Sequence, residues 1–188
     1  MPEPKPGSFS FEAGDLQHAL KNYSDAARLE PDNLQAATGA GEAAFQLGQY
    51  SKANRYLRTA VAIDSASQPT RRLLSLTDMV LAQDPLLPHL SPADRQSRLR
   101  WGVDQSLERL NGCFTQNQGT TEMQSLKTEA LALQAKLGPK SRLSDQDVVR
   151  TGVELVTRIE KATANCGEPS PGDQALLLIG HEHKGEQP

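Results

Sequence analysis

The chain has 188 residues and a formal net charge of −3; 37% of its residues are hydrophobic but only 4% are aromatic. This composition favours packed helices over sheets, and the lack of excess Lys and Arg argues against a nucleic-acid-binding surface. No apolar run reaches the roughly 18–20 residues that span a bilayer, and the first residues lack a secretory signal, so we expect a soluble protein with no membrane span.

The N-terminal half contains clear helix signals after a tail. Residues 1–8 include three prolines and are predicted to be a disordered tail. Apolar periodicity then predicts helices over residues 15–30, 34–47, 51–64 and 69–82. Pro31 ends the first helix, Asp32-Asn33 caps the second, and Gly48 ends the second in a left-handed conformation.

Two of these predicted helices repeat one pattern at a spacing of 34 residues. Gly14-Asp15-Leu16 aligns with Gly48-Gln49-Tyr50, and the register then holds along the helix. The matched pairs are Ala19 with Ala53, Tyr23 with Leu57, and Ala26 with Ala60. A fixed period of about 34 residues is typical of stacked helical hairpins, each of which buries its apolar face against a neighbour.

With these residues the segment resembles the tetratricopeptide repeat family. Gly41, Ala44, Ala53 and Ala60 stand where that family brings two helices close together. We therefore expect a repeat array over residues 9–83, with one complete repeat at residues 34–67 and a partial repeat on either side. The resemblance implies a scaffold that binds another protein.

In this family the leading helices line the concave, partner-binding side. The resemblance places on that side Gln35, Thr38, Glu42, Phe45, Arg72, Leu76 and Met79. Family members that clamp a terminal carboxylate use Asn with Lys or Arg at these turns, whereas Thr38 and Glu42 stand here, so we do not expect such a clamp. Burial of Phe45 and Met79 by neighbouring helices is the alternative.

Only residues 9–13 precede the first matched glycine, so most of the first hairpin's leading helix is missing. Either the Pro-rich tail replaces that helix, or the chain is cut from a longer precursor. The sequence as written predicts a cytoplasmic protein, whereas an exported precursor would place it in the periplasm.

The repeat pattern ends at Asp84-Pro85, and residues 91–180 predict a helical bundle. Ser91-Pro92 starts a helix that continues to about residue 114, and a second helix covers residues 122–137. A capping box at residues 144–147 opens a third helix, which ends near residue 165. Short connections favour an up-down-up bundle. The apolar segment at residues 174–179 either docks on this bundle or offers a helix to another protein, and residues 181–188 are a tail.

The chain has two cysteines, Cys113 and Cys166, at similar depths in helices that are predicted to be parallel. A disulfide between them would close a loop of about 53 residues and stabilise the fold by roughly 4 kcal/mol in the entropic model. Such a bond requires an oxidising compartment. Two unrelated, half-buried thiols are the alternative.

No catalytic motif, phosphate-binding loop or structural zinc pattern occurs in the sequence, and His181-Glu-His183 offers too few ligands for a metal site. We therefore predict neither an enzyme nor a cofactor.

The expected fold class is all-α: a short tetratricopeptide-type solenoid followed by a C-terminal helical bundle. Through Leu90–Asp94 and Arg158–Glu160, the layout is also similar to uncharacterised bacterial repeat proteins with a helical module at the C-terminus. The predicted function is that of a non-catalytic interaction scaffold or assembly factor. The alternative is a binding protein for a small apolar or lipidic ligand held between array and bundle.

Overall fold

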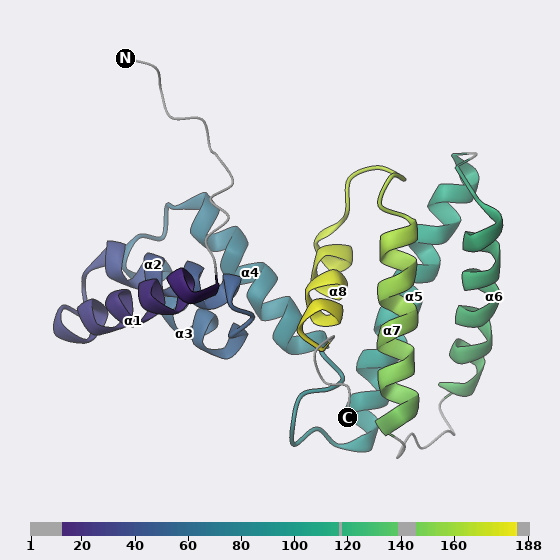
Figure 1. Cartoon of the computed structure of the whole chain (residues 1–188), viewed down its shortest axis with the longest axis horizontal. Coiled ribbons are helices and arrows are strands. Elements are labelled where there is room, and N and C mark those ends of the chain that lie inside the picture. Colours follow the sequence, from purple (N-terminus) through teal and green to yellow (C-terminus); the bar gives the residue numbers. More distant parts are fainter. Residues whose placement is uncertain (1–12, 117, 139–145, 184–188) are drawn as a thin grey trace. The chain divides into compact units, whose positions relative to one another are not determined.

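The computed structural model describes residues 13–116, 118–138 and 146–183, which form helices and no strands (Figure 1). The all-α fold class is confirmed. The helices are α1 (Ala13–Leu29), α2 (Leu34–Gln46), α3 (Tyr50–Ile63), α4 (Gln68–Gln83), α5 (Pro92–Thr115), α6 (Thr121–Lys136), α7 (Gln146–Ala162) and α8 (Pro171–Glu182).

The chain divides into two compact units, residues 1–77 (unit 1) and residues 78–188 (unit 2). The division falls inside α4, a few residues before the position at which the repeat pattern of the sequence ends.

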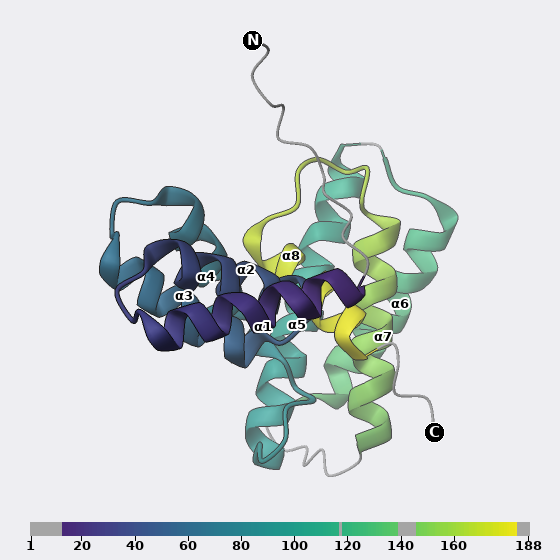
Figure 2. The ribbon, with the colours of Figure 1, turned by 60° about the vertical axis from the view of Figure 1, so that its left-hand side comes forward.

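In unit 1, α1 packs against α2 and α2 packs against α3 (Figures 1 and 2). The predicted signals at both ends of α2 are confirmed. The Asn33 side chain accepts a hydrogen bond from the Ala36 amide at 2.9 Å, which caps the helix, and Gly48 has a left-handed backbone with φ of 71°.

Small residues allow α2 and α3 to approach closely. A Cβ atom on Gly41 would lie 2.8 Å from the Leu57 side chain, so any larger residue at this position would push the helices apart. Ala44, Ala53 and Ala60 are fully buried at this contact region. The places that the repeat pattern assigns to small residues are therefore places of close packing between α2 and α3.

Unit 2 is a bundle in which α5, α6, α7 and α8 run alternately up and down (Figure 1). The Ser91 side chain caps α5 as predicted, accepting a hydrogen bond from the Asp94 amide. The third predicted helix, α7, ends at Ala162 rather than near residue 165. Its predicted capping box begins at Ser144, which lies outside the described residues.

The apolar segment at residues 174–179 is part of a longer helix than the sequence analysis expected. In α8, Leu176 and Ile179 are buried, and the helix packs on α5 and α7. Ser170 and Asp173 form a capping box with Pro171 at the first helical position. Because the same Ser-Pro-x-Asp pattern begins α5, this helix start was readable from the sequence.

A buried ionic cluster connects three helices of unit 2. Arg109 on α5 donates to Asp173 Oδ2 at 2.9 Å and to Thr163 Oγ1 at 3.0 Å, and its Nε lies 3.6 Å from Glu160 Oε2. Ser106 donates to Glu160 Oε1 at 2.8 Å. Burial raises the pKa of Glu160 to about 7, with the nearby Asp173 charge acting in the same direction and the Ser106 bond and Arg109 opposing it.

A disulfide bond joins Cys113, near the end of α5, to Cys166, in the turn after α7. The Cα atoms of the two residues are 5.3 Å apart, within the usual range for such bonds. The bond lies beside the ionic cluster, since Thr163 and Gly167 on this turn both accept hydrogen bonds from Arg109. The end of α5 is therefore held to the end of α7 by covalent and by charged contacts.

Candidate protein-binding groove

A shallow groove of about 380 Å³ crosses unit 1, and we call it the α2 groove. It is formed by one face of α2, by the turn between α3 and α4, by the start of α4, and by one side chain of α1. The lining residues are Tyr23, Leu34, Gln35, Thr38, Gly39, Glu42, Asp64, Ser67 and Thr70.

The helical period of α2 decides which of its side chains reach the groove. Its alanines at positions 36, 37, 40, 43 and 44 face the interior of unit 1 and are buried. Gln35, Thr38 and Glu42 recur at steps of three and four residues on the other side of the helix. The structure thus brings together in one groove three of the seven residues that the resemblance places on the partner-binding side.

The other four expected residues do not line the groove, and one of them, Leu76, is half-buried on α4. Phe45 is half-buried, packs against the core of unit 1, and makes an edge-on contact with Tyr50 at a ring-centre distance of 5.5 Å. Arg72 is exposed on α4. Met79 is half-buried and belongs to unit 2.

Several groove residues were not expected from the sequence. Tyr23 reaches the groove because its ring lies against the backbone of α2, where a Cβ atom on Gly39 would be 2.7 Å from the ring. The sequence held one signal for this contact, namely a glycine inside the predicted helix that follows the helix of Tyr23. Ser67 and Thr70 share a hydrogen bond of 2.8 Å across the start of α4, a local contact that the repeat pattern does not encode.

The α2 groove has acidic character. Glu42 and Asp64 line it, and its described lining contains neither Lys nor Arg. Partial burial of the carboxyl group raises the pKa of Glu42, because nearby protein atoms replace part of its water shell. A positive charge placed beside such a carboxylate would stabilise its ionised form.

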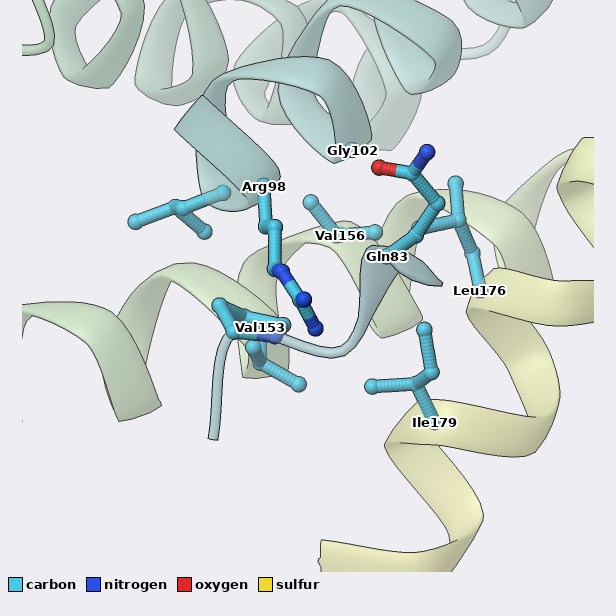
Figure 3. Close-up of a pocket in the computed structure, with 9 residues that line it drawn as sticks. Gln83, Arg98, Gly102, Val153, Val156, Leu176 and Ile179 are labelled. Atoms are coloured by element: carbon cyan, nitrogen blue, oxygen red, sulfur yellow. The ribbon is translucent and has the colours of Figure 1, made fainter. Parts of the chain in front are cut away.

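A second cavity lies inside unit 2, among α5, α7 and α8 (Figure 3). Its walls are mainly apolar, with Val153, Val156, Leu176 and Ile179 among them. Arg98 crosses its edge and donates to the carbonyl oxygens of Leu81 and Asp84 at 2.9 and 3.0 Å. The space accessible to a water-sized sphere is about 10 Å³, enough for about one water molecule and too little for a lipid chain.

Comparison with protein families identifies the segment that carries the groove. Residues 10–75 match the family model described as Tetratricopeptide repeat. This segment is similar to the tetratricopeptide repeat family. The resemblance drawn from the 34-residue period is therefore confirmed, and tetratricopeptide repeats generally mediate protein–protein interaction.

Neither the comparison with curated proteins nor the comparison with solved structures returns a significant match. Across the described residues, none of the helices has both the length and the apolarity needed to cross a bilayer.

Proposed function

We propose that this protein is a non-catalytic interaction module, a scaffold or an assembly factor, which binds a segment of another protein in the α2 groove. The observation that carries the proposal is the position of Gln35, Thr38 and Glu42. They share one groove, on the face of a tetratricopeptide helix opposite to its buried alanines. Side chains in such a groove are free to contact a partner without disturbing the core.

The charge of the groove defines the chemistry of the bound segment. Glu42 and Asp64 favour a segment that carries at least one Lys or Arg, which would restore to the Glu42 carboxylate the stabilisation lost with its water shell. An acidic segment or a free terminal carboxylate would instead be repelled.

Phe45, Arg72 and Met79 are proposed as flanking contacts of the same partner. Arg72, exposed on α4, is suited to an acidic residue outside the groove. The half-buried Phe45 and Met79 would offer the apolar parts of their side chains.

We also propose that the bond between Cys113 and Cys166 forms in the native protein, which then works in an oxidising compartment such as the periplasm. Intact mass after alkylation under unfolding conditions, with and without reductant, tests this proposal. The bond predicts that alkyl groups are added only after reduction, whereas two labels on unreduced protein would exclude it.

Selection from a library of displayed 12-residue peptides tests the groove. The wild-type protein should enrich sequences with Lys or Arg, and Glu42→Lys should abolish that enrichment. Asp32→Lys is the matched control, because it makes the same change of charge at an exposed turn outside the groove. Equal enrichment by Glu42→Lys and by the wild type would refute the proposal.

A further inference from the structure

Helix α8 is anchored at each of its two ends by a titratable side chain. At its start, Asp173 accepts a hydrogen bond from Arg109 of α5 at 2.9 Å. Just after its end, Nε2 of His183 lies 2.9 Å from Oδ2 of Asp84. The residues that α8 buries between these two anchors are small or apolar: Ala175, Leu176, Ile179 and Gly180.

The anchor at the start of α8 weakens as the pH rises. Glu160 of α7 shares Arg109 with Asp173, and its Oε2 has no hydrogen-bond partner among the described residues. Burial raises the pKa of Glu160 to about 7 against the opposing hydrogen bond of Ser106, so the group is mostly protonated at pH 5 and mostly ionised at pH 8. Ionisation places a second buried carboxylate beside that of Asp173, with one guanidinium between them. Undocking of α8 takes the Asp173 charge away from Glu160 and therefore relieves this repulsion.

The anchor at the end of α8 weakens in the same direction. The imidazole of His183 forms an ion pair with Asp84 only when it is protonated, and histidine is the side chain whose charge commonly changes between pH 5 and pH 8. The other charged groups at this turn are Arg98 and Arg95 of α5, which donate to the backbone carbonyls of Asp84 and of the residue after it, and Glu182 of α8 itself. Loss of the imidazole charge leaves a neutral hydrogen bond where an ion pair stood.

The connection ahead of α8 contains a hinge. Cys166 is fixed by its disulfide, and Thr163 accepts hydrogen bonds from Arg109, so the turn after α7 stays joined to α5. The residues that follow, 167–170, are all exposed, and Gly167 has a left-handed backbone with φ of 89°. Rotation at residues 167–169 would move α8 as one body without disturbing α5 or α7.

The underside of α8 is not completely filled. Leu176 and Ile179 of α8 line the small cavity of about 10 Å³ together with Gly102 of α5 and Val156 of α7 (Figure 3). Side chains that border an empty space lose the dispersion contacts that a filled core would give them. A helix of 12 residues that packs in this way is suited to open locally while the rest of the bundle stays folded.

We propose that α8 is a pH-sensitive helix, which docks on α5 and α7 in acid and undocks about residues 167–169 as the pH rises above neutrality. Undocking uncovers the apolar surface that Gly102, Val153 and Val156 form beneath it. The charge gained by Glu160 and the charge lost by His183 act at opposite ends of one helix and in the same direction. All of these groups belong to unit 2, so the proposal does not depend on the α2 groove.

Hydrogen–deuterium exchange of the full chain, with its disulfide intact, tests the proposal at pH 5 and pH 8. If undocking returned the pKa of Glu160 to 4.5, the equilibrium constant for undocking would rise about 70-fold between these two pH values. Because α5 and α7 still cover part of the carboxyl group, we expect the protection factors of α8 to fall at least about fivefold, after correction for intrinsic exchange.

Comparison with the bundle core separates undocking from global unfolding. At pH 8 the protection factors of α8 should lie at least about tenfold below those at the centre of α5. Equal protection of α8 and α5 at pH 8 would overturn the proposal, because α8 would then open only together with the whole unit. Equal protection of α8 at both pH values would overturn it as well.

Two variants assign the effect to the two anchors. Glu160→Gln should raise the protection of α8 at pH 8 and remove most of its pH response, whereas Glu154→Gln, at an exposed position of the same helix, should retain the response. His183→Gln keeps a hydrogen-bonding group but cannot gain a charge, so it should lower the protection of α8 at pH 5 and have little effect at pH 8. A full pH response in Glu160→Gln, or an equal loss at both pH values in His183→Gln, would overturn the proposal.

Discussion

Replacing Glu160 by Gln should change how the stability of unit 2 depends on pH. The Glu160 side chain is fully buried, and its pKa is raised from 4.5 to about 7, so the folded protein holds this proton more tightly than the unfolded chain. The free energy of unfolding therefore falls as pH rises from about 4.5 to about 7, by about 3 kcal/mol in total. Gln is a neutral residue of nearly the same shape and still accepts the hydrogen bond of Ser106.

Urea unfolding followed by circular dichroism at pH 5 and pH 8 measures this effect. Near pH 5, Glu160→Gln and the wild type should differ by less than about 1 kcal/mol, whereas at pH 8 the variant should be more stable by about 2–3 kcal/mol. Glu154→Gln, which removes an exposed carboxylate from the same helix, is the control for the change of charge. Parallel curves of stability against pH for Glu160→Gln and the wild type would refute the reasoning.

Three further substitutions test contacts within unit 1 or within unit 2. Ala53→Leu should destabilise unit 1 by roughly 1–3 kcal/mol in thermal unfolding, because Ala53 is fully buried in the closely packed core; a neutral result would argue against close packing there. Cys113→Ser should cost about 2–5 kcal/mol under oxidising conditions and much less in reductant; an equal cost in both would speak against the native disulfide. Ser170→Ala should cost roughly 1 kcal/mol through loss of the α8 cap, measured by urea unfolding, and an unchanged midpoint would contradict the role of the capping box.

The repeat region was predictable because its signals are local. The caps of α2, the glycine that ends it, and the small residues at its contact with α3 all follow from sequence spacing and backbone geometry. The groove was only partly predictable. Gln35, Thr38 and Glu42 follow from the period of one helix, whereas Tyr23 and Asp64 reach the groove through the packing of different elements.

In unit 2, too, local signals were predictable and contacts between distant segments were not. The start of α5 was predicted from Ser91-Pro92, whereas the start of α8 at Ser170-Pro171, which has the same pattern, was not predicted. The cluster around Arg109 was not found from the sequence. Glu160, Thr163 and Asp173 lie 51 to 64 positions after Arg109 and meet it only when α5, α7 and α8 pack.

Site-specific photo-crosslinking is the most direct test of the proposed function. A photoreactive amino acid replaces Thr38 in the α2 groove, and in a second protein it replaces Ser51, exposed on α3 outside the groove. With a basic 12-residue peptide selected on the wild type, crosslinks should form at position 38 and not at position 51. Equal labelling at the two positions, or labelling at position 51 alone, would contradict binding in the groove.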